Sequence, residues 1–468
     1  RLLQALPNQP FLVTATRCGG LMGYEPDGAQ NPTGGLVSGF TKALARERPK
    51  VLIKTVDFEA SASTADIANH LINETLWDPT VNEVGWHGDQ RFSLTLVDQP
   101  LSEASSPFLP KHPVYLVSGG TAGIIAPILL DLAEHTQGSF FLLGRHALPE
   151  AEDSDLTRLQ TDPIGLKKDL MARLAARGEK ATPARVEEEL AALQRTAATL
   201  GTIAELRKRG AQVRYLICDV TSAEATEAAV RQALDSAGRV DVLLHAAGVE
   251  YSRRFERKTQ QEIEQTVAVK DTGFFNLYRA LLDHNALPQH IMAFSSVAAR
   301  FGNTGQTDYS AANDLLCRMM SALRRQHPKV KAQVIDWGAW GEVGMASRGH
   351  MPELMKRAGI ELLKPAAAAP CVYRELAFAP AGEAVIAGSL GQMEAEFSQK
   401  NSLNGEKANE IIQRKQPKFA MLQRLIGFTP EEGFEFESEL DPQQEPFLRD
   451  HARNGIPLLP GVMGVEAF

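Results

Sequence analysis

The sequence contains few cysteines and no long apolar run. Its four cysteines, Cys18, Cys218, Cys317 and Cys371, lie far apart and form no CxxC pair or Cys/His cluster. This spacing favours buried thiols in a reducing compartment over disulfides or zinc ligation, so we expect no metal. No apolar run approaches the ~20 residues that cross a membrane, and no signal peptide is visible. We therefore predict a cytoplasmic protein with no membrane partner.

The sequence also lacks an excess of basic residues. Its 49 Lys+Arg against 57 Asp+Glu give a net charge of −8 over 468 residues. Nucleic-acid binding needs a basic surface to neutralise phosphates, so we expect no nucleic-acid partner. The 44% hydrophobic and 23% charged residues are typical of a soluble globular protein, and the length predicts two or three domains. Because residue 1 is arginine rather than methionine, we expect the chain to be a piece of a larger protein.

Apolar segments and helical segments alternate through residues 109–392. Units of this length indicate an α/β fold with a doubly wound parallel Rossmann sheet. The first unit, 112–133, begins as a buried strand, turns through glycines and continues as a helix. Further strands are expected at 139–145, 213–221, 239–250, 290–298, 331–340 and 383–388, and further helices at 222–237, 259–284 and 307–326.

Residues 151–210 interrupt this alternation between the second and third expected strands. The segment is rich in Ala, Leu, Glu, Lys and Arg, which predicts two or three amphipathic helices. We interpret the insertion as a solvent-exposed helical flap, and a docking surface for another domain is the alternative.

Residues 1–108 look like an incomplete copy of the second half of the main domain. PFLVTATRCGG parallels HIMAFSSVAAR, GGLVSGFTKALARERP parallels the helix that carries Tyr309, and KVLIKTVDFEA parallels AQVIDWGAW. In this alignment the position of Tyr309 falls near Gln30, and no glycine loop precedes it. We therefore predict a degenerate Rossmann-like structural subdomain that buries one side of the active domain.

A glycine-rich loop, SGGTAG, joins the first strand to its helix. Glycines let backbone amides approach a pyrophosphate, and the helix N-terminus favours the negative charge. Ala122 and Ile125 stand where glycines are usual, so the packing of helix on strand must be solved differently. The cofactor-binding candidates in this loop are Ser118, Gly119, Gly120, Thr121, Gly123 and Ile124.

The ends of later strands complete the predicted cofactor site. Arg145 ends the second strand, where an acid would hold the 2′-hydroxyl of NAD but an arginine suits a 2′-phosphate. This favours NADPH, and an ordinary surface arginine is the alternative. Asp219 and Val220 follow the third strand, where adenine contacts are usual. The HAAG segment would let the backbone pass close to the cofactor sugar at Ala246, Ala247 and Gly248.

Four residues form the predicted catalytic set. Ser296 ends the fifth strand, and Tyr309 begins a helix thirteen residues later, so their hydroxyls would flank the nicotinamide site. Many Rossmann-type reductases have a lysine four residues after the tyrosine, but Asn313 stands there, and Lys270 on the preceding helix is the candidate replacement. A nearby ammonium lowers the tyrosine pKa and can relay protons. We predict that Tyr309 protonates a carbonyl oxygen as NADPH delivers hydride, while Ser296 stabilises that oxygen and Asn313 positions Lys270 or a water.

With this exchange of lysine and asparagine, the segments FSSVAARFGNTGQTDYSAAND, HAAGV and DWGAWGEVGM resemble the ketoreductase domain of type I polyketide and fatty-acid synthases. SGGTAGI and the insertion are more similar to ketoreductases of polyunsaturated-fatty-acid and enediyne-type iterative synthases. The resemblance covers about residues 10–390 and implies a short-chain dehydrogenase/reductase fold.

The family resemblance also implies a substrate and a partner. These are a β-ketoacyl thioester and the acyl carrier protein whose phosphopantetheine arm holds it. Residues 340–359 resemble the lid that closes over this arm. The family signatures for the hand of the alcohol are absent, since EYS stands at 250–252 and a phenylalanine at Phe301.

The last stretch carries His451, Gly455 and Pro460 in the pattern HxxxGxxxxP. This resembles the start of a hot-dog-fold dehydratase, whose histidine removes the α-proton of a β-hydroxyacyl chain. The partner acid lies later in such domains, so the site would be incomplete here. The predicted organisation is a structural subdomain at 1–108, a catalytic subdomain at 109–392, a linker at 393–432 and the dehydratase start at 433–468.

Two other functions stay open from the sequence. The first is a catalytically impaired scaffold, because Ala122 and Ile125 alter the cofactor loop, although Lys270, Ser296 and Tyr309 argue against it. The second is a free-standing reductase of small metabolites, against which the degenerate half-domain and the dehydratase-like end speak.

Overall fold

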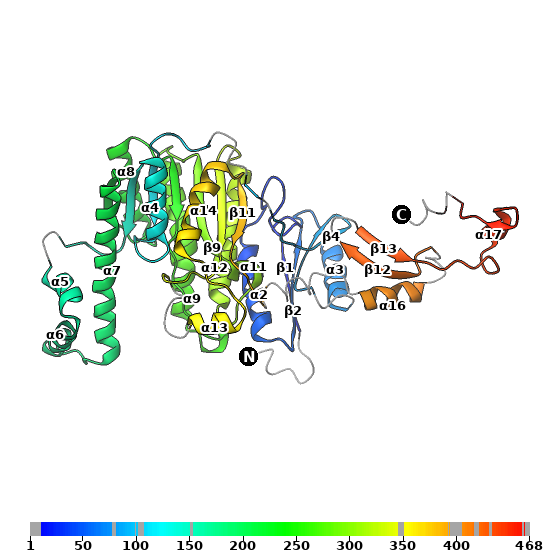
Figure 1. The fold of residues 1–468 in the computed structure, drawn as a ribbon, viewed down its shortest axis with the longest axis horizontal. Coiled ribbons are helices and arrows are strands. Elements are labelled where there is room, and N and C mark those ends of the chain that lie inside the picture. The colour runs from blue at the N-terminus through cyan, green and yellow to red at the C-terminus, as the bar shows by residue number, and fades with distance from the viewer. Residues whose placement is uncertain are drawn as a thin grey trace. The chain divides into compact units, whose positions relative to one another are not determined.

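The protein is represented by a computed structural model (Figure 1). It describes residues 11–76, 81–98, 100–101, 107–149, 153–344, 351–391, 393, 405–415, 421–429, 433–460 and 463. The chain divides into two compact units, Arg1–Phe397 and Ser398–Phe468. The first unit therefore ends within a few residues of the expected end of the catalytic subdomain.

A seven-stranded sheet organises the first unit. Its strands lie in the order β11-β10-β9-β8-β5-β6-β7, and every neighbouring pair is parallel. Because the chain leaves β5 first toward β6 and later returns to its other side at β8, the order reverses between β5 and β8, where ligands bind in folds of this kind. The predicted doubly wound parallel sheet is thus confirmed. The strands are β5 (Val114–Ser118), β6 (Ser139–Gly144), β7 (Gln212–Ile217), β8 (Val242–His245), β9 (His290–Ser296), β10 (Lys331–Trp337) and β11 (Gly382–Ile386).

Helices cover both faces of this sheet. Successive strand residues point to opposite faces, and the apolar residues on each face pack against helices. Leu116 and Leu243 pack with α8, α10 and α12 in one core, whereas Val117 and Leu244 pack with α4 and α14 in the other. The covering helices are α4 (Ile125–Thr136), α8 (Ala223–Ala237), α10 (Gly273–Asp283), α12 (Thr307–Gln326) and α14 (Pro365–Phe378). Shorter helical segments are η1 (Phe255–Arg257), α9 (Gln260–Val267), η2 (Ala268–Thr272), α11 (Val297–Phe301) and α13 (Met351–Arg357).

The insertion forms three helices, α5 (Ser154–Thr161), α6 (Pro163–Ala176) and α7 (Pro183–Lys208). Figure 1 shows α5 and α6 beside the end of α7 that lies away from the sheet. These helices share a small apolar core of their own, formed by Leu166, Leu170, Leu174, Val186 and Leu190. Along the part of the chain that the structure describes, no helix combines the length and apolar character needed to span a membrane.

The N-terminal residues build a separate four-stranded sheet in the order β1-β2-β3-β4. Its helix α2 crosses α12 closely, because a Cβ atom on Gly39 would lie only 2.3 Å from the Ser310 carbonyl oxygen. Glycine at this point lets the two backbones meet. The elements are β1 (Phe11–Thr16), α2 (Gly34–Glu47), β2 (Leu52–Phe58), α3 (Thr64–Leu76), β3 (Glu83–His87) and β4 (Gln90–Phe92), with β4 antiparallel to β3.

Buried charges join the N-terminal elements to the larger sheet. Lys42 Nζ of α2 lies 2.9 Å from Asp314 of α12, and Arg300 of α11 forms an ion pair with Glu83 of β3. Removal of one member of such a buried pair costs about 3–5 kcal/mol, because the other charge is left uncompensated. The pairs therefore fix how the N-terminal elements dock.

The described residues of the second unit form two hairpins and two helices. Its elements are α16 (Gly405–Lys415), β12 (Arg424–Thr429), β13 (Gly433–Glu437), α17 (Pro446–Asp450), β14 (Ala452–Arg453) and β15 (Ile456–Pro457). Strands β12 and β13 pair antiparallel across the predicted boundary between the linker and the dehydratase start. Main-chain hydrogen bonds thus tie the end of the expected linker to the segment after it, and the predicted domain bounds stay a prediction. The hot-dog fold stays a prediction.

Candidate active site

The glycine loop lies at the end of β5, beside β8. Gly119, Gly120 and Gly123 all have positive φ, at 104°, 78° and 70°, which favours glycine. A Cβ atom on Gly119 would lie 2.6 Å from the carbonyl carbon of Ala246, so the loop can pass over the end of β8 only with glycine there. At Gly120 the same atom would meet nothing within 4 Å, which leaves that backbone open to a ligand.

A cavity of about 420 Å³ opens beside this loop. Eight of the residues predicted to bind a cofactor line it: Gly119, Gly120, Thr121, Arg145, Asp219, Val220, Ala247 and Gly248. The other four, Ser118, Gly123, Ile124 and Ala246, are not among its lining residues.

The cavity suits a phosphate-bearing dinucleotide. The Thr121 hydroxyl is buried and has no hydrogen-bond partner among the described residues, so it is free to donate to a phosphate oxygen. Helix α4 begins at Ile125 with no side-chain cap, which leaves its first backbone amides available for an anion. The residues present therefore fit a nicotinamide dinucleotide.

The missing glycine at position 125 has a structural explanation. Ile125 is 2% exposed and belongs to the core between α4, α14 and the sheet. Helix and strand are thus joined by a buried apolar side chain rather than by close backbone contact. The substitution changes how α4 packs and leaves the loop conformation intact.

Local hydrogen bonds position Tyr309 in the first turn of α12. The neighbouring Asp308 is buried, accepts from the Tyr309 backbone amide at 2.8 Å and forms an ion pair with Lys258 at 2.6 Å. Asn313 donates from Nδ2 to the Tyr309 carbonyl oxygen at 2.8 Å. The Asn313 Oδ1 atom is buried and unpartnered among the described residues, so it can accept from a further group.

Lys270 lies in η2, a π-helical turn, which is a local geometry common at functional sites. Its Nζ atom donates to the Phe294 carbonyl oxygen at 2.9 Å. A Cβ atom on Gly248 would lie 2.9 Å from the same Nζ, so the ammonium borders a residue of the cavity wall. Burial lowers the pKa of Lys270 to about 8.

The pKa of Tyr309 is raised to about 12. Burial is the main cause, the Glu250 carboxylate adds to the rise, and hydrogen bonds with Ser296 and Asn313 oppose it. The Lys270 ammonium donates to the Phe294 carbonyl oxygen, and its predicted effect on Tyr309 stays a prediction. The hydrogen bonds with Ser296 and Asn313 favour the ionised tyrosine.

His245 connects the cofactor loop to the lysine. Its Nδ1 lies 2.8 Å from the Ser118 hydroxyl and its Nε2 lies 2.8 Å from the Lys270 carbonyl oxygen. Burial and the Lys270 charge lower the pKa of His245 to about 3, so the ring is neutral. Since a carbonyl oxygen only accepts, Nε2 carries the proton and Nδ1 accepts from Ser118. The sequence analysis placed Ser118 in the SGGTAG motif and His245 in the HAAG motif, but it did not predict the hydrogen bond between them.

The predicted lid, 340–359, lies partly outside the described residues, at 345–350. Its first part is anchored, since Gly341 N donates to the Leu363 carbonyl oxygen at 2.9 Å. Its last part contains α13.

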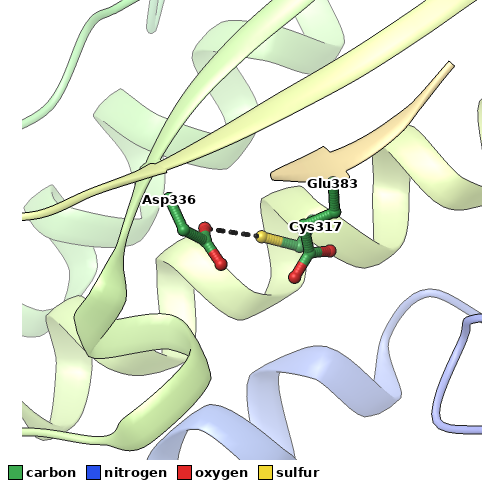
Figure 2. Close-up of side chains that lie close together, drawn as sticks. All are labelled: Cys317, Asp336 and Glu383. Carbon is green, nitrogen blue, oxygen red and sulfur yellow. Dashed lines mark hydrogen bonds between the residues drawn. The ribbon is translucent and has the colours of Figure 1, made fainter. Parts of the chain in front are cut away.

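Cys317 and Asp336, which are buried, and Glu383, which is half-buried, form a group of potential metal ligands (Figure 2). Cys317 Sγ lies 3.6 Å from Asp336 Oδ1. Burial raises the pKa values of both Cys317 and Asp336 well above their usual ranges, which favours the neutral thiol and carboxylic acid. Glu383 accepts from Arg318 at 2.8 Å and from the Tyr24 hydroxyl at 2.5 Å. These protein partners, rather than a cation, account for the cluster. All four cysteines are free thiols.

His451 lies in the second unit, immediately after α17. Its side chain is exposed, and its carbonyl oxygen accepts from Leu458 N at 2.8 Å beside the β14–β15 hairpin. Its role in a dehydratase stays a prediction.

Comparison with known proteins identifies the family. Residues 113–342 match the family model described as the KR domain. This segment is a ketoreductase (KR) domain of the kind found in type I polyketide and polyunsaturated-fatty-acid synthases, and the predicted family is confirmed. The dehydratase start stays a prediction.

Two relatives illustrate the match in sequence. The chain is 28% identical over 382 residues to a polyunsaturated fatty acid synthase protein of Thraustochytrium sp., across 78% of this chain and 13% of that protein. It is 26% identical over 333 residues to polyketide synthase PksL of Bacillus subtilis, across 70% of this chain and 6% of that protein. The chain therefore spans only a small part of these relatives.

Solved structures show the same fold. An A-type ketoreductase from a modular polyketide synthase superposes with a TM-score of 0.65 at 22% identity, over 84% of this chain and 71% of the other. The first-module ketoreductase of phoslactomycin biosynthesis in Streptomyces sp. HK803 gives 0.64 at 21% identity, over 86% and 82%.

Proposed function

We propose that the chain reduces a β-ketoacyl thioester on an acyl carrier protein to the β-hydroxyacyl thioester, with NADPH, inside a polyketide or fatty-acid synthase. The observation that carries the proposal is the group of Tyr309, Ser296 and Asn313, in which Asn313 Nδ2 donates to the Tyr309 carbonyl oxygen at 2.8 Å, with Lys270 against the wall of a dinucleotide-sized cavity. The KR family match supports the reaction class.

The preference for NADPH rests on the end of β6. Arg145 follows this strand and lines the cavity, and no acid follows it in the segment Gly144–Arg145–His146. A guanidinium binds a phosphate in bidentate fashion, whereas an acid at this point would bind a ribose hydroxyl.

The bound cofactor supplies the hydride that reduces the carbonyl carbon. As the carbonyl π electrons move to oxygen, the Tyr309 hydroxyl donates its proton to that oxygen, and the Ser296 hydroxyl donates a hydrogen bond to the developing charge. A Tyr309 pKa of about 12 keeps the proton available at neutral pH. Lys270, with a pKa of about 8, is charged at neutral pH and can return a proton to the tyrosinate.

The proposed partners are the acyl carrier protein and the other domains of the same synthase. The relatives named above are multidomain synthases of which this chain spans a fraction. His451 would act in the next step, since a β-hydroxyacyl chain is the substrate of a dehydratase.

The proposal is tested by NADPH oxidation with a β-ketoacyl pantetheine thioester and identification of the alcohol. We expect turnover by the wild-type chain and a loss of at least ~100-fold in kcat for Tyr309→Phe. Tyr278→Phe is the matched control, because that hydroxyl hydrogen-bonds His327 on the outer side of α10 and α12. NADPH binding without reduction, or equal rates in wild type and Tyr309→Phe, would refute the mechanism. No NADPH binding at all would support the scaffold alternative.

A further inference from the structure

Helix α7 of the insertion forms part of the cavity wall. Ala192, Arg195, Thr196 and Thr199 all line the cavity. Their spacing of three and four residues puts them on one face of the helix. The insertion is therefore more than the solvent-exposed flap predicted from its sequence.

The C-terminal half of α7 is fixed to the cofactor loop. The Thr202 hydroxyl donates to the Thr121 carbonyl oxygen at 3.0 Å, and both residues are buried. Leu206 is fully buried in the core beneath α4, and Arg209 pairs with Glu134 of α4 at 3.0 Å. Arg195 lies two turns before Thr202, about 10 Å along the helix axis. Its distance from the glycine loop is thus set by a rigid element.

Arg195 has no anionic partner within the described part of the chain. It is exposed, and no described residue forms a hydrogen bond or ion pair with its side chain. Arginines that pair with carboxylates are the rule elsewhere in the insertion, as for Arg158, Arg173, Arg177, Arg185 and Arg209.

The cavity contains a second guanidinium of the same kind. Arg145 also forms no ion pair with any residue that the structure describes. The carboxylate that lines the cavity, Asp219, accepts from the backbone amide of Thr221 at 3.0 Å and from its hydroxyl at 2.8 Å. Two uncompensated cations thus border one cavity from different elements, which suits a phosphate that carries more than one negative charge.

We infer that Arg195 is a specificity-determining residue, which binds the 2′-phosphate of NADPH together with Arg145. The helical insertion thereby forms part of the cofactor site. This inference rests on the proposed NADPH-dependent function. The Thr202–Thr121 hydrogen bond holds α7 against the glycine loop. The cofactor would therefore contact residues of the insertion as well as residues at the ends of the strands.

Calorimetric titration of the full chain with 2′,5′-ADP and with 5′-AMP isolates the 2′-phosphate. We expect Arg195→Ala to weaken the binding of 2′,5′-ADP about tenfold or more and to change the binding of 5′-AMP less than about twofold. The control is Arg185→Ala, on the same helix but paired with Glu179 and Glu188 and absent from the cavity wall. It should leave both affinities within about twofold.

Two results would overturn the inference. Unchanged affinity for 2′,5′-ADP would show that Arg195 does not contact the 2′-phosphate, and equal losses for both ligands would show a structural role only. If the wild-type chain bound 2′,5′-ADP no better than 5′-AMP, the NADPH preference and this inference would both fall. Turnover with NADH would then tell whether the ketoreduction itself survives.

Discussion

The two halves of the first unit that we predict to be related have a buried aspartate at corresponding positions, but the two aspartates have different partners. Asp57 and Asp336 are each the next-to-last residue of their strands, β2 and β10. Both are buried. Asp57 accepts hydrogen bonds from the Thr16 hydroxyl at 2.6 Å and from three backbone amides of residues 18–22 at 2.7–2.9 Å. One oxygen of Asp336 has no partner among the described residues, and burial raises its pKa well above the usual range.

We propose that this difference suits the N-terminal half to a structural role. In the N-terminal half, the carboxylate holds the loop after β1 in place, so the loop serves as a fixed connection. Among the described residues of the other half, no backbone amide after β9 donates to Asp336, whose Oδ1 lies 3.6 Å from Cys317 Sγ instead. The aspartate therefore fixes the loop after β1 but not the segment between Ser296 and Tyr309, which we propose serves catalysis.

The largest effect is expected when the hydrogen bonds that Asp57 accepts from the loop after β1 are disrupted. Asp57→Asn removes the charge and directs an amide group at backbone N–H donors, so we expect a loss of about 3 kcal/mol in the free energy of unfolding. Asp336→Asn replaces one neutral group with another and should cost less than about 1 kcal/mol at pH 5. Denaturant unfolding of both variants measures the contrast, and equal costs would contradict it.

A second experiment sharpens the comparison through pH. Because the folded-state pKa of Asp336 is raised, the folded chain keeps a proton that the unfolded chain releases above about pH 4. Wild-type stability should therefore fall relative to Asp336→Asn as pH rises from about 4. Unfolding curves of both proteins at several pH values test this, and a constant difference between them would disprove a raised pKa.

A smaller effect is expected at Glu250. This carboxylate contributes to the raised pKa of Tyr309, so Glu250→Gln should lower that pKa. Since the reaction needs the protonated tyrosine, the alkaline limb of the kcat profile should move to lower pH. A pH–rate profile checks the direction. An unmoved limb, or one moved to higher pH, would exclude the electrostatic effect.

The alternation of apolar segments and helix-forming segments was sufficient to predict most of the fold, because it marks the strand and helix pairs between residues 112 and 388. The sequence also predicted Tyr309, Ser296 and the glycine loop as site residues, and the structure places them in the first turn of α12, at the end of β9 and after β5. It missed contacts between distant segments. Arg195 looked like a surface residue, because only packing of α7 on the core brings it to the cavity. The Lys270 ammonium points to the Phe294 carbonyl oxygen from a π-helical turn, and the local sequence does not predict that turn.

The central claim, that only the second half is catalytic, is tested most directly at the aligned pair Tyr309 and Gln30. Gln30 accepts from the Ala60 amide at 3.3 Å and belongs to the structural half. NADPH oxidation with a β-ketoacyl thioester should fall at least ~100-fold in Tyr309→Phe and stay within about twofold of wild type in Gln30→Ala. A retained rate in Tyr309→Phe, or a matching loss in Gln30→Ala, would contradict the account.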